Sequence, residues 1–323
     1  MEYRILKHTD LSVSRLSFGT MTFGSQSDET SARRMVDRCL EAGVNFFDTA
    51  NMYNHGQAET LLGKALTGRR HKVIVATKVR SKMGDGASES GLSAAAIYKA
   101  IEASLKRLST DYVDVYYLHW PDYETPIEEA LATLEDLVAA GKLRYPAVSN
   151  YAAWQVAEMH CISAQHRLRP PHISQQMYNL LARAIEEEYV AFTKRFGISI
   201  VGYNPLAGGL LSGKYTKERK AIAGGRFYQN QLYLNRYWHD DYFAAVEALE
   251  RIGRETGRSL VELSLQWLLA QPHVDSVILG ASRIEQLDEN LQACEGPPLD
   301  KSILARCDEV WKRLRGITPK YNR

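Results

Sequence analysis

The feature that most constrains the fold of this chain is a regular alternation of short β-rich runs with helical patterns, beginning near residue 15. Such alternation is typical of βα units, whose strands join into one parallel sheet. Eight runs have strand character, and eight repeats favour a closed (β/α)8 barrel, a TIM barrel of the α/β class, over an open sheet. The expected strands are residues 15–21, 45–50, 72–78, 112–119, 143–150, 172–178, 198–205 and 275–281.

The segments between these runs have the spacing of amphipathic helices. Ile97, Ile101 and Leu105 recur every four residues, which predicts an apolar stripe that covers the outer face of the sheet. Several of the helices are followed shortly by a glycine, which predicts left-handed C-caps before the next strand, at Gly43, Gly141 and Gly197. The pattern is that of a repeating unit with short turns.

Three additions interrupt the repeat. We expect an N-terminal β-hairpin in "YRILKHTDLSVS", a long insertion after the seventh strand at about residues 207–240, and a C-terminal helix and tail after residue 295. No Ser- or Pro-rich linker divides the chain, so residues 1–323 are expected to form a single domain. A doubly wound sheet is the alternative, but the GxGxxG turn that normally follows its first strand is absent from the sequence.

Composition excludes several classes of function. The 323 residues are 45% apolar and 24% charged, and the net charge of +2 provides no broad field for nucleic acid. The N-terminus is charged from its second residue and no apolar run approaches the ~20 residues that span a bilayer, so we expect a cytoplasmic protein without membrane contact. The cysteines show no zinc-ligand spacing, so we expect no metal and reduced thiols, at Cys39, Cys161, Cys294 and Cys307.

Polar residues end three of the expected strands, namely Asp48, Lys78 and His119, and Tyr53 lies in the loop after the first of them. In a barrel these side chains converge on one mouth. Each residue alone has an ordinary structural explanation: the aspartate caps a helix, the lysine is solvated and the histidine packs in a turn.

Together the four residues have a chemical logic. A phenol has a pKa near ~10, and a neighbouring ammonium group lowers it, so Lys78 is expected to make Tyr53 a better acid. Asp48 balances the charge of the lysine, and His119 can donate a hydrogen bond to a substrate oxygen. The pattern predicts a proton-donating site for a carbonyl group.

The sequences around these residues resemble the aldo-keto reductase superfamily over nearly the whole chain. The tetrad stands in the family's order within "FFDTANMY", "VIVATK" and "DVYYLHWPD". The resemblance is closer to the aflatoxin-aldehyde and succinic-semialdehyde reductases, through "SNYAAWQVAE", "YNPLAGGLLSGKY", "GRF", "NRYW", "VILGASRIEQLDENL" and the terminal "KYNR". It implies a barrel, a nicotinamide cofactor, reduction of a small-molecule carbonyl substrate and a homodimer.

The resemblance also implies a cofactor site. Ser149, Asn150 and Gln175 would hold the nicotinamide carboxamide, and Tyr203 would stack on its ring. The glycine-rich "NPLAGGLLSGK" suits a pyrophosphate. Ser282 and Arg283, expected in the first turn of a helix, match the family's 2′-phosphate clamp and favour NADPH over NADH. The other implied contacts are Gly19, Thr20, Met21, Asp48, Asn204, Leu206, Gly208, Ser212, Lys214, Arg226, Gly280, Gln286 and Asn290.

The sequence departs from the family pattern at Pro146 and Ala147, where relatives commonly carry an Ile-Gly-like pair. Proline removes a ladder hydrogen bond from a central strand, so a bulge is expected there, with consequences for Ser149 and Asn150.

The sequence indicates the identity of the substrate less clearly than the type of reaction. Met52, Trp120 and Trp238, together with Met21 and Tyr237, could wall an apolar pocket around Tyr53 and His119, or simply pack. Arg323 could bind a substrate carboxylate if the tail folds over the mouth.

Two other functions are consistent with the same barrel. The chain could be a cofactor-binding regulatory subunit resembling the potassium-channel β subunits, although the subgroup motifs and the lack of a long N-terminal extension weigh against this. It could also be a phosphate-binding isomerase or aldolase, which would use Lys78 to form a Schiff base and would not bind NADPH.

Overall fold

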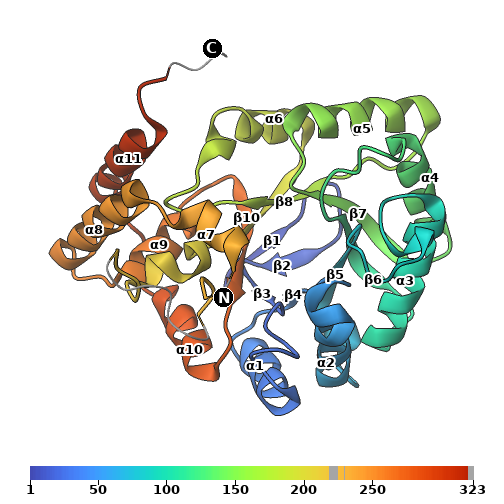
Figure 1. The fold of residues 1–323 in the computed structure, drawn as a ribbon, viewed down its shortest axis with the longest axis horizontal. Helices are drawn as coiled ribbons and strands as arrows, with labels where there is room; N and C mark the ends of the chain where they lie inside the picture. The colour runs from blue at the N-terminus through green and yellow to red at the C-terminus, as the bar shows by residue number, and fades with distance from the viewer. Residues whose placement is uncertain (218–224, 229, 319–323) are drawn as a thin grey trace.

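A computed structural model describes residues 1–217, 225–228 and 230–318. Within them, eight parallel strands close into a barrel in the order β10-β3-β4-β5-β6-β7-β8-β9 (Figure 1). The expected (β/α)8 barrel is therefore confirmed, with each strand inside or within a residue of its expected range. The strands are β3 (Leu16–Gly19), β4 (Phe46–Asp48), β5 (Ile74–Val79), β6 (Val113–Leu118), β7 (Leu143–Ser149), β8 (Ile173–Met177), β9 (Ser199–Tyr203) and β10 (Val274–Gly280).

Helices surround the barrel (Figure 1). They are α1 (Glu29–Glu41), α2 (Gln57–Ala65), α3 (Ala94–Leu108), α4 (Ile127–Ala139), α5 (Ala153–His166), α6 (Tyr189–Phe196), α7 (Gln231–Tyr237), α8 (Asp240–Glu255), α9 (Leu260–Leu269), α10 (Ile284–Ala293) and α11 (Lys301–Arg315). Short 3₁₀ helices are η1 (Tyr53–Gly56), η2 (Arg70–Lys72), η3 (Ala87–Glu89), η4 (Ala184–Glu186) and η5 (Ala207–Ser212). The predicted stripe of α3 is buried, and the backbone is left-handed at the three predicted glycines, Gly43, Gly141 and Gly197.

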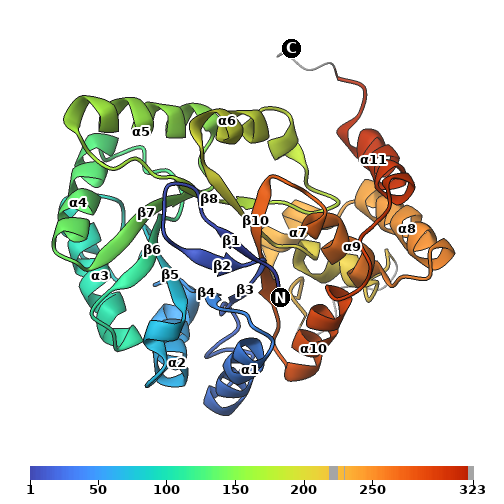
Figure 2. The ribbon, with the colours of Figure 1, turned by 180° about the vertical axis from the view of Figure 1, so that it is seen from behind.

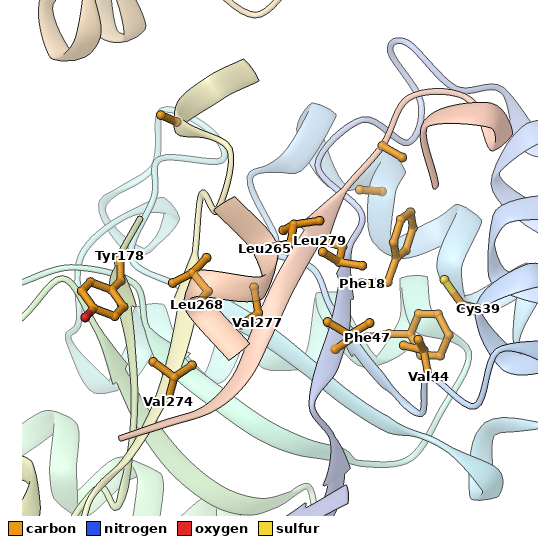
Figure 3. Close-up of a cluster of buried hydrophobic side chains, with 14 of the residues drawn as sticks. Phe18, Cys39, Val44, Phe47, Tyr178, Leu265, Leu268, Val274, Val277 and Leu279 are labelled. Carbon is orange, nitrogen blue, oxygen red and sulfur yellow. The ribbon is translucent and has the colours of Figure 1, made fainter. Parts of the chain in front are cut away.

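The main core lies between the barrel and its helices. Figure 3 shows Val277 and Leu279 of β10 near Leu265 of α9, and Phe47 of β4 near Val44. All five side chains are at most 1% exposed. At roughly 25 cal/mol per Å² of apolar surface removed from water, a layer of this kind supplies most of the driving force for closing the barrel.

A second cluster fills the barrel interior. The hairpin of β1 (Tyr3–Ile5) and β2 (Ser12–Ser14), predicted from the sequence, crosses one end of the barrel (Figure 2). Its Leu6, Leu11 and Val13 are buried with inward-facing strand residues. Lys7 N donates to Ser199 Oγ at the start of β9 (2.8 Å), so the hairpin covers the amino-terminal ends of the strands. The mouth at the carboxyl ends remains for a site.

The bulge expected at Pro146 is not present. β6 and β7 pair without a register shift, with Val115 opposite Tyr145 and Tyr116 opposite Pro146. β7 pairs with β8 at Val148 and Ser149, which lie beyond the proline. The missing N–H therefore removes no bond from that ladder, and the strand reaches the mouth undistorted.

The insertion between β9 and β10 contains η5, α7, α8 and α9. The C-terminal helix is α11, and Arg323 lies outside the described residues, so its predicted substrate contact is not tested. All four cysteines are described and are free thiols. Every helix in the described ranges is too short or too polar to traverse a bilayer. The same ranges bring no three His, Cys, Asp or Glu side chains into a group suited to a metal ion.

Two neighbouring histidines at the hairpin end give a prediction about the pH dependence of stability. The rings of His8 and His172 lie 4.1 Å apart between centroids, and burial, with the charges of neighbouring histidines, lowers the pKa of His172 to about 4. Unfolded histidine has a pKa of about 6.5, so the unfolded chain takes up this proton first as pH falls. The stabilisation from neutral His172 is complete above about pH 6.5 and is lost as pH falls toward about 4.

We therefore expect the free energy of unfolding to decrease less in His172→Gln than in the wild type when the pH falls from 7 to 4.5. Urea denaturation at each pH measures this free energy. His166→Gln, at an exposed position of α5, should keep the wild-type slope. An unchanged slope in His172→Gln would contradict this account.

Candidate active site

The structure brings the four tetrad residues together at the carboxyl-terminal mouth. Asp48 ends β4, Lys78 lies next to the last residue of β5, and His119 directly follows β6. Adjacent pairing of these strands sets their side chains beside one another, and Tyr53 enters from the first residue of η1. This is the convergence predicted from the strand ends.

Lys78 is the centre of the cluster. Its side chain is fully buried, and Nζ donates to Asp48 Oδ1 and to the carbonyl oxygen of Thr49 (2.7 Å). The Tyr53 hydroxyl lies 3.5 Å from the same nitrogen. Burial lowers the pKa of Lys78, whereas the charge and hydrogen bond of Asp48 raise it. A buried ammonium group persists only with such a partner, so Asp48 keeps the lysine charged and fixes its direction.

The prediction that Lys78 lowers the pKa of Tyr53 is wrong for the protein without a bound ligand. Burial raises the pKa of Tyr53 well above its ordinary value, and the charge of Asp48 adds to the increase. The ammonium group of Lys78 is engaged by Asp48 and Thr49 at shorter distances than by the phenol. Tyr53 therefore holds its proton at neutral pH, as a proton donor must.

His119 is neutral. It is 8% exposed, and burial together with the charge of Lys78 lowers its pKa well below the ordinary value. Nδ1 is buried and has no hydrogen-bond partner within the described residues. The His119 and Tyr53 rings meet edge to face, 6.2 Å apart between centroids. A neutral imidazole can donate one hydrogen bond to an uncharged oxygen near the phenol.

The turn that carries Tyr53 is held in an unusual conformation. Asn54 and His55 both have left-handed backbones, with φ of 49° and 54°, and Gly56 follows with φ of 85°. Non-glycine residues rarely adopt this conformation, which costs of order 1–3 kcal/mol each and needs support from surrounding contacts. Asn54 Nδ2 supplies such contacts by donating to the carbonyl oxygens of Met21 (3.0 Å) and Phe23 (2.6 Å).

The residues expected around the carboxamide are contiguous with the tetrad. Gln175 Nε2 donates to Asp48 Oδ2 (2.8 Å), and Ser149 Oγ donates to the Gln175 carbonyl oxygen (3.0 Å). Asn150 Nδ2 donates to the His119 carbonyl oxygen (2.9 Å), and the Tyr203 hydroxyl donates to Asn150 Oδ1 (2.7 Å). One hydrogen-bonded network thus runs from β4 to β9.

A second group of predicted residues gathers cations. Burial lowers the pKa of Lys214, and the positive charges of Arg283 and Arg226 lower it further. Positive charges close enough to lower the pKa of a lysine favour an anion between them. Ser282 N and Oγ both donate to Gln286 Oε1, at 2.9 and 3.1 Å. Helix α10 begins at Ile284, so Ser282 and Arg283 precede its first turn instead of lying in it.

The remaining predicted cofactor contacts lie at strand ends and in η5. Gly19 ends β3 and Thr20 Oγ1 donates to the Asp48 carbonyl oxygen (3.2 Å). Gly280 ends β10, and its carbonyl oxygen accepts from Asn290 Nδ2 (3.3 Å). In the η5 region Leu206 is the N-cap, Asn204 Oδ1 accepts from Gly208 N (2.7 Å), and Ser212 Oγ donates to Gly209 O (2.7 Å).

The predicted substrate wall divides into two parts. Met21 and Met52 are each 39% exposed at the mouth, and the Trp120 ring lies 4.6 Å from that of His119. Trp238 instead packs against Phe227 and Phe243, with ring centroids 5.2 and 5.0 Å away. Trp238 is partly exposed and packs within the insertion, so its predicted contact with the substrate stays a prediction.

Tyr237 also packs. It is 1% exposed, and its hydroxyl accepts from Asn179 Nδ2 (3.1 Å) and Asn204 Nδ2 (2.8 Å). Its contribution is to hold the insertion on the barrel.

Tyr233 was missed by the sequence reasoning. It lies on α7, with the guanidinium groups of Arg226 and Arg236 5.4 and 5.5 Å from its ring, and the positive charge of Arg226 lowers the pKa of Tyr53. The insertion therefore reaches the tetrad. Only the aromatic content of the insertion could have suggested this, because α7 belongs to no β/α repeat.

Comparisons with known proteins agree with this geometry. The model of the aldo/keto reductase family matches residues 15–312. A probable voltage-gated potassium channel subunit beta of Oryza sativa subsp. japonica is 38% identical over 308 residues, with 93% of each chain covered. The human aflatoxin B1 aldehyde reductase member 2 is 37% identical over 322 residues, covering 94% of this chain and 88% of the human one. An uncharacterized oxidoreductase of Bacillus subtilis, YrpG, is 36% identical, with 99% of each chain covered.

Proposed function

Because the chain belongs to the aldo/keto reductase family, an oxidoreductase family, we propose that it reduces aldehydes and ketones to alcohols with NADPH. The observation that carries this proposal is the contact of buried Lys78 with Asp48 and Tyr53, beside a neutral His119. It combines a protonated acid with a second hydrogen-bond donor at one point of the mouth.

The residues divide the work of a reduction. Tyr53 transfers the proton of its hydroxyl to the carbonyl oxygen, and His119 donates a hydrogen bond to the same oxygen, which polarises the carbonyl group. Lys78, held by Asp48, places positive charge beside the phenol and stabilises the phenolate left after the transfer. A reduced nicotinamide bound at this mouth would supply the hydride.

The residues present fit such a cofactor. The Ser149, Asn150 and Gln175 side chains offer the hydroxyl and amide groups that recognise a carboxamide, and they join the tetrad through Asp48. A group of cations suited to phosphates is formed by Lys214, Arg226 and Arg283, which all follow the tetrad residues in the sequence. The Tyr203 ring, at the end of β9, is the candidate for stacking.

Arg283 tests the preference for NADPH. We expect Arg283→Ala to raise the Kd for NADPH at least ten-fold and that for NADH less than two-fold, because only NADPH carries a 2′-phosphate for the guanidinium group. Quenching of intrinsic fluorescence during titration with each nucleotide gives both constants. Arg254→Ala, at an exposed arginine of α8, is the matched control. Equal losses for the two nucleotides would refute the assignment.

A regulatory role is the second candidate, because two relatives, from Oryza sativa and Arabidopsis thaliana, are named as probable potassium channel β subunits, each 38% identical. Oxidation of NADPH, followed by its absorbance with 4-nitrobenzaldehyde and with succinic semialdehyde, separates the two candidates. Rapid turnover supports the reductase. Tight NADPH binding without turnover supports the regulatory role, and absence of binding contradicts both.

Other features of the chain remain proposals. We propose that residues 1–323 form one domain, that the enzyme acts in the cytoplasm, where its four free cysteines remain reduced, and that it forms a homodimer. Arg323 is proposed as a ligand for the carboxylate of substrates such as succinic semialdehyde.

A further inference from the structure

A cavity of about 280 Å³ lies beside the Tyr53 turn. It is bounded by the end of β5, the loop that follows it, and one face of α3, where Ala96, Ala100 and Ala103 leave the space open. Asn51 and His55, on either side of Tyr53 in the chain, also line it. Its lining, as far as the chain is described, includes no tetrad residue, so it is distinct from the candidate active site.

The lining is positively charged. Arg80, Lys99 and Arg107 face the cavity, and Glu89, which pairs with Lys99, is the acidic residue among its described walls. Arg107 pairs with Glu59, which is fully buried and is not part of the lining. Arg80 Nε is buried and lacks a hydrogen-bond partner in the described residues. The hydroxyls of Ser88 and Ser90 add further donors.

An unsatisfied polar side chain lies in the same wall. Asn51 is 1% exposed, and its Oδ1 finds no hydrogen-bond partner within the described part of the chain. Burying a polar group without a partner costs roughly 1–3 kcal/mol, so a hydrogen-bond donor that enters beside Asn51 would relieve this cost. Because Asn51 offers both an acceptor and donors, it suits the protonated or amide part of a molecule whose anionic group meets the arginines.

The cavity is mechanically connected to the Tyr53 turn. A Cβ atom built on Gly56 would lie 2.6 Å from Arg107 Cδ, so the left-handed turn rests directly on this cavity residue. Any molecule that draws the Arg107 side chain toward the cavity would change the contact that supports Gly56, and with it the position of the Tyr53 hydroxyl.

We propose that this cavity binds a small organic anion carrying a phosphate or carboxylate group, and that its binding acts on the turn that positions Tyr53. The guanidinium groups of Arg80 and Arg107 take the anion, since their planar donors match both groups, and the serine hydroxyls complete its contacts. The cavity volume of about 280 Å³ lies just below the ~300–1,000 Å³ of typical ligand pockets, which favours a small metabolite.

Calorimetric titration with inorganic phosphate and, separately, with malonate tests the site. All proteins carry Arg283→Ala, so that the cation cluster near α10 contributes less to phosphate binding. We expect Lys99→Gln and the cavity-filling Ala100→Phe to weaken binding of the preferred anion at least ten-fold. Lys106→Gln removes the same charge from an exposed position of α3 outside the cavity and should bind as the parent does.

The outcomes are distinct. Phosphate binding alone assigns a phosphate ligand, malonate binding alone assigns a carboxylate, and binding of both assigns the shared anion chemistry. Binding of neither, or equal weakening in Lys106→Gln, overturns the site. These titrations are independent of catalysis.

The effect on the turn rests on the proposed reductase activity. The bound anion should change kcat for 4-nitrobenzaldehyde at least two-fold in the parent and not in Ala100→Phe. An anion that binds without changing kcat or KM overturns the coupling, whereas an enzyme without any turnover contradicts the proposed function instead.

Discussion

Replacing Tyr53 by Phe is expected to lower kcat by at least ~10²-fold while leaving the Kd for NADPH within about two-fold of wild type. The loss follows because the phenol is the protonated acid of the mouth, 3.5 Å from the ammonium group of Lys78. His119 still polarises the carbonyl group but, being neutral and depressed in pKa, does not replace a lost acid. Steady-state loss of NADPH absorbance gives kcat, and nucleotide titration gives Kd.

Tyr98→Phe is the matched control, because it removes a hydroxyl from an exposed tyrosine on α3 that bonds only with Asp136 among the described residues. It should retain wild-type turnover. If Tyr53→Phe also retained it, another group would be the acid. A loss of NADPH binding in Tyr53→Phe would instead indicate a structural defect in the mouth.

Asp48→Asn is expected to lower the free energy of unfolding by roughly 3–5 kcal/mol, the range for a buried ion pair that loses one partner. Both carboxylate oxygens of Asp48 are engaged, one by Lys78 and the other by Gln175, and the lysine has no exposed surface. The amide cannot balance the ammonium charge. Urea denaturation should show a lower midpoint with an unchanged m value.

The loss should depend on pH. Without Asp48, burial holds the pKa of Lys78 further below its unfolded value of about 10.4. Between the folded and unfolded values the unfolded chain binds the extra proton, so stability rises with pH in that window. The difference between Asp48→Asn and wild type should therefore shrink as pH is raised toward ~10.

Two further variants check the cause. Asp37→Asn breaks the partly exposed pair with Arg69 and should cost under about 1 kcal/mol. The double variant Asp48→Asn, Lys78→Met removes the unpaired charge and should recover part of the stability. A cost below 1 kcal/mol in Asp48→Asn, or no recovery in the double variant, would mean that Lys78 does not depend on Asp48 for its charge.

Local chemistry explains why the sequence alone predicted so much of this protein. The period of the apolar residues indicated the eight barrel strands and the helices between them, because a buried parallel strand and a helix covering it need different spacings. The strand ends then located Asp48, Lys78 and His119, since a barrel brings all carboxyl ends to one mouth. The same reading of local patterns found the hairpin and the left-handed glycines.

What the tertiary structure decided depends on neighbours distant in the chain. The pKa of Tyr53 rises because burial and the charge of Asp48 outweigh the positive charge of Arg226, a balance of distances that sequence spacing cannot give. Pro146 causes no bulge because β7 pairs with β8 at Val148 and Ser149, after the proline. Trp238 packs against Phe227 because the insertion folds on its own aromatic residues. The cavity beside α3 is lined by three alanines of that helix, together with residues of the Tyr53 turn that are distant in the chain. Sequence period fixes which elements form, whereas the charge and space around a side chain are set only when those elements meet.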